Sequence, residues 1–206
     1  MAENRLKHCK ASCDLAIFTY SHPTGVTYTM IHTERLHIMP LSVAALELYL
    51  QGNNLFELKY GLAINDRLVA PEVRRFVHAI TLPCMRKSPG DHYLFFTFWL
   101  VIEQSTGIVV AELGFKGVPN PAGMVEIGYG TMPEARKKGF MTEAVGGLIN
   151  WASTREDTKT ILAETANSNT ASMRVLQKNG FEQFDQRGDM LWWRKSLSQN
   201  SGFTPV

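Results

Sequence analysis

The stretch between residues 124 and 152 constrains the fold more than any other part of the chain. It opens with MVEIGYG, in which apolar and aromatic residues are interspersed with Glu126 and two glycines, as expected of a β-strand. Pro133 ends that strand because it has no N–H to donate to a sheet. From Phe140 to about Ala152, apolar residues recur every four positions and form one stripe of a helix. The sequence therefore predicts a strand, a turn and a helix in immediate succession.

The turn between this strand and this helix is basic. Arg136, Lys137 and Lys138 stand directly before Gly139. A helix N-terminus presents unpaired N–H groups and a partial positive charge, and three cationic side chains raise the local potential further. Gly139 allows the backbone to approach a ligand where a Cβ would interfere. These features suit pyrophosphate binding, although neither the Walker nor the Rossmann glycine pattern occurs here.

The string EIGYGTMPEARKKGFMTEA resembles the acyl-CoA loop of the GNAT acetyltransferases, and is most similar to their RimJ/RimL-like branch. The signature of that loop is Q/R-x-x-G-x-G/A, and residues 136–141 read RKKGFM. Met141 departs from the pattern, because glycine or alanine is usual at that position. A solvated basic turn would explain the charges, but it would not explain the whole string.

A second motif follows about thirty residues later, in the order that the family has it. Asn169 and Ser172, then the string KNGF at residues 178–181, resemble the family pattern N-x-x-S followed by E-K-x-G-F. The resemblance covers roughly residues 33–197. It implies one acetyltransferase domain over residues 30–197, an N-terminal extension of unknown role over residues 1–29, and a tail over residues 198–206.

The predicted fold is α/β with a mixed, strongly twisted sheet (α+β in character) flanked by helices. The strands at 124–130 and 159–165 should be parallel and joined by the helix over 140–152. Residues 55–70 show no regular pattern, and Pro83 is expected to close the second helix. Further strands are expected at 33–41, 92–103 and 108–115, further helices at 43–50, 71–80 and 171–179, and a hairpin at 181–193.

The resemblance implies acetyl-CoA as co-substrate and a primary amine as acceptor. The pyrophosphate should lie on the N–H groups between Lys137 and Thr142, and Asn169 would either bond the pantetheine arm or serve only as a helix cap. The expected ligand-binding residues are Thr131, Met132, Arg136, Lys137, Lys138, Gly139, Phe140, Met141, Thr142 and Asn169. The acceptor would be a protein N-terminus, of the kind found on ribosomal proteins, or a small amine such as an antibiotic or a polyamine. A non-catalytic acyl-CoA-binding module is the remaining alternative.

Transfer from a thioester to an amine needs a neutral amine, a stabilised oxyanion and a thiolate that can leave. Glu126 is the acid within the central strand and is the candidate base, with Glu164 on the next strand as a competitor. The alternative is that Glu126 is only a structural partner for a neighbouring strand or loop. Backbone N–H groups at Thr131 and Met132 would hold the oxyanion. Many family members return the thiolate's proton from a tyrosine whose position is Leu176 here, so Ser172 is the candidate substitute, unless it only packs in the first helical turn.

The composition of the chain limits which classes of partner we expect it to have. The net charge of +2 does not favour nucleic acid, and no apolar run reaches the ~20 residues that span a bilayer. Three cysteines, an odd and sparse set, fit a reducing compartment, so we expect a cytoplasmic protein, monomeric or homodimeric, without a metal site. No cysteine falls in either motif, which favours direct transfer without an acetylated enzyme.

Overall fold

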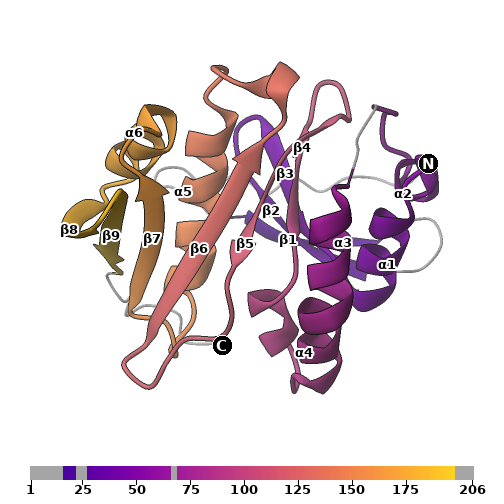
Figure 1. The fold of residues 1–206 in the computed structure, drawn as a ribbon. Helices are drawn as coiled ribbons and strands as arrows, with labels where there is room; N and C mark the ends of the chain where they lie inside the picture. The colour runs from indigo at the N-terminus through magenta and orange to yellow at the C-terminus, as the bar shows by residue number, and fades with distance from the viewer. Residues whose placement is uncertain (1–15, 22–26, 66–68, 198–206) are drawn as a thin grey trace.

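The computed structural model describes residues 16–21, 27–65 and 69–197. These residues form a nine-stranded sheet in the order β1-β2-β3-β4-β5-β6-β7-β9-β8, with helices on both faces (Figure 1). The strands are β1 Ala16–Ser21, β2 Thr27–His32, β3 Leu36–Pro40, β4 Trp99–Glu103, β5 Val109–Phe115, β6 Met124–Thr131, β7 Thr160–Ala166, β8 Glu182–Arg187 and β9 Met190–Ser196. The mixed α/β architecture predicted from the sequence is thereby confirmed.

The strand pairs of the described residues are antiparallel except for β6 and β7, which are parallel. The chain passes from β6 to β7 through helix α5, as the sequence predicts for a crossover connection. The helices are α1 Val43–Gln51, α2 Leu55–Tyr60, α3 Pro71–Phe76, α4 Leu82–Lys87, α5 Phe140–Ser153 and α6 Thr170–Lys178, with a π-turn at Val77–Thr81 and 3₁₀ turns at His92–Phe95 and Pro133–Ala135.

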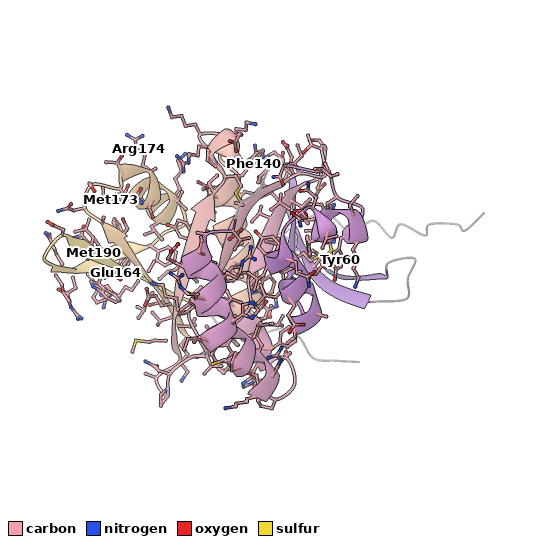
Figure 2. The ribbon with its side chains drawn as sticks, turned by 45° about the vertical axis from the view of Figure 1, so that its right-hand side comes forward. Tyr60, Phe140, Glu164, Met173, Arg174 and Met190 are labelled. Carbon is pink, nitrogen blue, oxygen red and sulfur yellow. The ribbon has the colours of Figure 1, made fainter. Side chains whose placement is uncertain are left out.

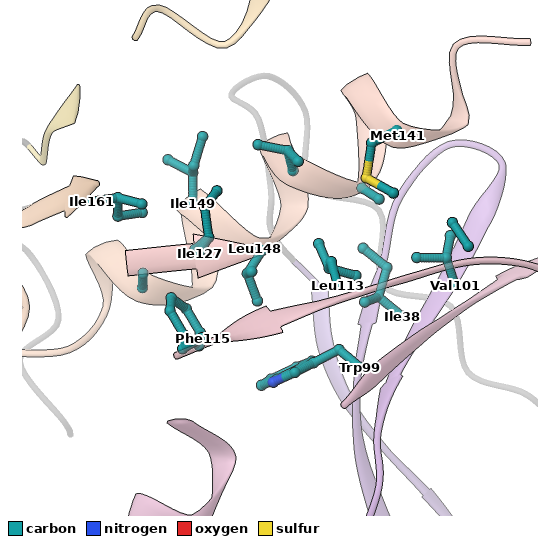
Figure 3. Packing of buried hydrophobic residues seen from close by; sticks show 14 of the residues in the cluster. Ile38, Trp99, Val101, Leu113, Phe115, Ile127, Met141, Leu148, Ile149 and Ile161 are labelled. Atoms are coloured by element: carbon teal, nitrogen blue, oxygen red, sulfur yellow. The ribbon is translucent and has the colours of Figure 1, made fainter. Parts of the chain in front are cut away.

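Two hydrophobic clusters lie on opposite faces of the sheet. One packs α5 against the strands, with Trp99, Leu148 and Ile161 among its members (Figure 3). The other packs α1, α2 and α4 against the opposite face. Gly147 allows α5 to lie close to the sheet, since a Cβ there would meet the Ile38 Cδ1 atom at 2.9 Å. The strands and the helix that bear the site described below, β6, β7 and α5, are packed in the first of these clusters.

Three local expectations were wrong. The aromatic run at 92–103 is a strand only from Trp99, because residues His92–Phe95 form a 3₁₀ turn that buries Leu94 and Phe95. Residues Leu55–Tyr60 form a helix and bury Phe56 completely. The second helix does not end at Pro83: the π-turn leads directly into α4, where the proline occupies a first-turn position that needs no N–H.

The segment 1–29 was expected to be an extension outside the domain. Its described residues include β1, which pairs with β2, and β2 pairs in turn with β3 through Ile31 and His32, beyond the expected boundary. These backbone contacts continue the sheet toward the N-terminus.

Candidate functional site

The site begins where the pairing of β6 and β7 stops. Their register ends at Ile127 and Ala163, although β6 continues to Thr131 and β7 to Ala166. Figure 1 shows the two strands diverging toward their C-terminal ends. Because alternate residues of a strand bond to opposite neighbours, the backbone groups of Tyr129 and Thr131 face the opening toward β7. These groups are the ones that an extended ligand could bond.

Met132 does not share this arrangement. Its N–H donates to the carbonyl oxygen of Val110 at 3.0 Å, on the β5 side of the strand. An oxyanion donor has to be free to bond the ligand, so the expectation that Met132 would supply one is wrong. Thr131 remains as the backbone donor proposed from the sequence.

The basic turn connects this open edge to α5. Lys137 and Gly139 both adopt the left-handed backbone conformation, with φ of 64° and 83°. Gly139 is the N-cap residue and has no side chain to bond the first turn, so the N–H groups that open α5 are available to a ligand. The side chains of Arg136, Lys137 and Lys138 are exposed around it. This geometry leaves the N-terminus of α5 open and surrounded by cations, and anion binding there stays a prediction.

Met141, which departs from the family pattern, points away from this anion site. Its side chain is 5% exposed and packs in the cluster beneath α5 (Figure 3). Phe140 is buried next to it. A ligand at the helix N-terminus would therefore contact the backbone at residues 140 and 141, and the larger side chain does not block it.

Arg35 braces the basic turn, a role that the sequence did not reveal. Its Nη1 donates to the Lys138 carbonyl oxygen at 3.1 Å, and its Nε donates to Glu143 Oε2 at 2.8 Å. The guanidinium also lies 4.9 Å from the ring centre of Phe140. Burial raises the pKa of Glu143, but hydrogen bonds from Thr33 and Arg35 outweigh burial and hold that pKa below its usual value. The string TERL at 33–36 offered a weak signal, because it holds an arginine directly before a strand.

Ser172 lies at the opposite side of the opening, in the first turn of α6. Its Oγ is 2.8 Å from the Tyr129 hydroxyl oxygen, so β6 and α6 are linked by a hydrogen bond. Burial raises the pKa of Tyr129, which keeps its hydroxyl protonated. Asn169 caps α6 by accepting the Ser172 N–H at 3.1 Å. Leu176, where many family members have tyrosine, is fully buried in the core.

The two acids predicted as candidate bases, Glu126 and Glu164, lie on β6 and β7. Glu126 forms an ion pair with Lys116 of the turn after β5. Glu164 is one residue beyond the last β6–β7 pair, at a half-buried position, and Figure 2 shows it on β7 in the part of the molecule where α6 and β9 also lie. Neither carboxylate lines the cavity that adjoins the site.

That cavity lies on the face of β5 and β6 that is turned away from α5, and it has a volume of about 400 Å³. Its lining carboxylate is Glu112 of β5, which accepts a hydrogen bond from the buried Tyr49 hydroxyl. Sequence reasoning missed Glu112, although an acid inside the apolar strand VVAELGF is a signal. The lining residues are Phe76, Ile80, Thr81, Phe96, Thr97, Phe98, Glu112, Leu113, Gly114, Phe115, Lys116, Gly117, Gly128, Tyr129 and Gly130.

The described residues contain no cluster of three or more acidic, histidine or cysteine side chains that could hold a metal ion. Cys84 on α4 is a free cysteine, and Cys9 and Cys13 lie outside the described residues. In the part of the chain that the structure covers, none of the helices combines the length and apolarity needed to cross a membrane.

Comparison with known proteins finds related acetyltransferases. A family model described as an acetyltransferase (GNAT) domain matches residues 35–182. The chain is 38% identical over 86 residues to the uncharacterized N-acetyltransferase YjdG of Bacillus subtilis, which is 42% of this chain and 51% of that protein. It is 27% identical over 84 residues to the uncharacterized N-acetyltransferase YoaA of the same organism, 41% of this chain and 48% of that protein. The chain thus spans about half the length of the curated relatives it matches.

Solved structures share the fold. RimL, a ribosomal L7/L12 α-N-protein acetyltransferase in complex with coenzyme A, aligns with a TM-score of 0.58 at 16% identity, over 82% of this chain and 97% of that one. The ribosomal-protein-S5-alanine acetyltransferase of Vibrio fischeri aligns with a TM-score of 0.57 at 17% identity, over 86% and 100% of the two chains. At these identities the likeness concerns the fold.

Proposed function

Since this chain belongs to the GNAT acetyltransferase family, whose domain model matches residues 35–182, we propose that it transfers an acetyl group from acetyl-CoA directly to a primary amine. The observation that supports the proposal is that the unpaired edge of β6 continues directly into the basic turn. The unpaired edge of β6 at Tyr129 and Thr131 runs into the basic turn, and the turn ends at the open N-terminus of α5. An extended chain with a pyrophosphate at one end and a thioester at the other fits that path.

In the proposed complex the pyrophosphate accepts hydrogen bonds from the N–H groups that open α5. The cations Arg136, Lys137 and Lys138 surround it, and a helix N-terminus with nearby cations favours this charge. The pantetheine arm extends along the β6 edge and can use Asn169 as a further partner. That RimL was solved with coenzyme A supports the same ligand here. These ligand-binding residues remain predictions.

The chemistry is a single displacement. The neutral amine nitrogen attacks the thioester carbonyl carbon, a C–N bond forms, and the resulting oxyanion is held by the Thr131 N–H. The C–S bond then breaks and the thiolate takes a proton from Ser172, which regains one from Tyr129 and solvent, while the nitrogen passes the proton that the amide does not keep to the base or to water. Ser172 is placed to donate to the thiolate, because the protonated Tyr129 hydroxyl can bond to its Oγ and leave the Ser172 proton directed outward.

A base has to take the proton from the amine before attack. Glu126 was predicted for this role, and its ion pair with Lys116 favours the alternative reading of a structural partner. Glu164 remains a second candidate, and Glu112 is a third because it lines the cavity. The variants Glu126→Gln, Glu164→Gln and Glu112→Gln separate them: the true base is the one whose loss lowers kcat and is partly rescued at higher pH, where more amine is neutral.

Two acceptors follow from the sequence. A protein N-terminus is one, and RimL and the S5-alanine acetyltransferase are named for such acceptors. A small amine is the other, and the apolar cavity beside the site favours it. A cytoplasmic location and a monomeric or homodimeric state also remain predictions.

The test is acceptor-dependent release of free thiol from acetyl-CoA. We expect thiol release when amines are added, and no acetyl group on the protein after incubation with acetyl-CoA alone. Acetyl-CoA binding without thiol release for any amine would favour a non-catalytic acyl-CoA-binding module. An acetylated side chain in the absence of acceptor would overturn direct transfer.

A further inference from the structure

We propose that the acceptor is a small monoamine with an apolar body, bound in the cavity between α3 and the β5–β6 face with its nitrogen toward Glu112. This inference rests on the proposed acetyl transfer and names the class of its substrate. Three independent features of the cavity carry it: its walls, its floor and its charge.

The walls are apolar side chains that are left in contact with solvent. Phe76 of α3 is 57% exposed and Ile80 of the π-turn is 51% exposed, and both line the cavity. Phe96 and Phe98 line it from the segment that leads into β4. Large apolar side chains gathered around one concave surface mark a ligand site rather than a random exposure. A volume of about 400 Å³ suits a small organic molecule.

The floor consists of glycines on neighbouring strands. Glu112 pairs with Gly130 and Gly114 pairs with Gly128, so all four residues lie on one face of the sheet. Gly114 is required by packing, since a Cβ there would meet the Thr97 carbonyl oxygen at 2.8 Å. Packing does not require Gly130, because a Cβ there would meet nothing within 4 Å and its backbone has the conformation of an ordinary strand. Glycine weakens a strand, so its presence at this position is explained by the open space it leaves above the floor.

The charged residues that line the cavity indicate which polar group its ligand carries. Among the described residues that line it, Glu112 is the only one with a carboxylate, and it lies opposite Gly130, next to the proposed oxyanion donor Thr131. The other lining residue that carries a full charge is Lys116, which is already paired with Glu126. One carboxylate complements one ammonium group. The second cation of a polyamine would find no second carboxylate among the described lining residues and would approach Lys116, and the amide groups of a peptide would meet an apolar wall without polar partners.

The experiment compares three acceptors at saturating acetyl-CoA: 2-phenylethylamine, spermidine, and a hexapeptide with an N-terminal serine. We expect the kcat/KM of thiol release to be at least tenfold higher for 2-phenylethylamine than for either of the others. Higher kcat/KM for spermidine or for the peptide would overturn the inference while leaving acetyl transfer intact. If no acceptor releases thiol, or if acetyl-CoA does not stabilise the protein against heat, the proposed function fails and this inference fails with it.

Matched variants assign the effect to the cavity. Gly130→Val fills the floor, and we expect it to raise the KM for 2-phenylethylamine at least fivefold while leaving the dissociation constant of acetyl-CoA unchanged. Phe76→Ala should raise the same KM. Phe184→Ala should not, because Phe184 is similarly exposed at 42% but lies on β8, away from the cavity. An unchanged KM in both Gly130→Val and Phe76→Ala, with folding verified by circular dichroism, would show that the amine binds elsewhere.

Discussion

Ser172 and Tyr129 are joined by a hydrogen bond of 2.8 Å although 43 residues separate them in the chain. The contact bears on whether Ser172 acts as a proton donor or only packs in the helix. A serine in the first turn of a helix could simply pack there, whereas a serine that accepts a hydrogen bond from the partly buried Tyr129 hydroxyl would have its own proton free to give. Met141 and Leu176 also stand at positions of the family motifs, but both are buried in the core.

Tyr129→Phe should slow acetyl transfer without weakening acetyl-CoA binding. Ser172→Ala should lower kcat about 100-fold, as expected for loss of a general acid, and Tyr129→Phe by about tenfold because Ser172 remains. The double variant should be no slower than Ser172→Ala alone, since the two groups act in series. Steady-state kinetics and direct titration of acetyl-CoA measure these quantities. Equal, multiplicative losses from the two substitutions would contradict a relay.

The turn from η3, the 3₁₀ turn Pro133–Ala135, into α5 is the element on which the proposed ligand binding depends. Its shape comes from two left-handed residues, and its position comes from Arg35, which bonds both the Lys138 carbonyl and Glu143. The turn is thereby fixed to the start of β3. The proposed anion site would therefore be formed before the ligand arrives.

Gly139→Glu should abolish stabilisation by acetyl-CoA. At about 100 times its dissociation constant the ligand should add roughly 2.7 kcal/mol to the free energy of unfolding of the parent protein. The variant places bulk and negative charge where the phosphates bind. Gly188→Glu is the matched control, because Gly188 also has a positive φ, of 57°, and open space around it. Both variants should lose some stability through backbone strain, but only the first should lose the ligand's contribution. Equal ligand stabilisation of the two would reject the assignment of this turn.

Glu143 should make the protein less stable in acid. Its folded-state pKa lies below the ordinary value of 4.5, so its contribution is present above pH 4.5 and is lost as pH falls through the folded-state pKa. Glu143→Gln should cost about 1 kcal/mol at pH 7, a modest value because Arg35 is partly exposed, and progressively less as the pH falls through the folded-state pKa of Glu143. Urea unfolding over a series of pH values from 7 into acid measures this. Glu134→Gln, at an exposed position of the same turn, is the control, and a loss that does not decline with falling pH would contradict the ionic origin.

At the scale of the whole molecule, β6 separates the two proposed binding regions. Its edge toward β7 faces the proposed acetyl-CoA path, and its glycine-bearing face forms the floor of the proposed acceptor cavity. Val125 and Ile127 anchor β6 in the hydrophobic cluster beneath α5, so both regions are built on a packed element. Transfer would then take place around one strand, without a large movement of the domain.

Hydrogen exchange should reveal the unpaired edge. Acetyl-CoA should slow exchange of the amides of Tyr129 and Thr131, because these face the opening toward β7. The amides of Gly128 and Gly130 face β5 and should change little, which makes them internal controls on the same strand. Exchange monitored by NMR with and without ligand resolves the four residues. Protection that is equal at all four, or absent at Tyr129 and Thr131, would place the ligand elsewhere.

The sequence alone predicted the order of elements from β5 to β9, the parallel pairing of β6 with β7, and the basic turn. It could do so because strands and helices have different apolar periods and because proline and glycine mark where each ends. It failed where local signals conflicted: the aromatic run before Trp99 resembles a strand but forms a turn, and Pro83 resembles a helix end but follows a π-turn.

The tertiary structure alone decided which side chains share a site. Arg35 meets Glu143 across 108 residues, Tyr49 meets Glu112 across 63, and Tyr129 meets Ser172 across 43. Each contact depends on strand order and register, which set neighbours in space that no local pattern encodes. The sequence by itself therefore determined the elements and the basic turn, because both depend on adjacent residues. The cavity proposed for the acceptor and the proposed proton path depend on how distant strands align, and so only the folded chain defined them.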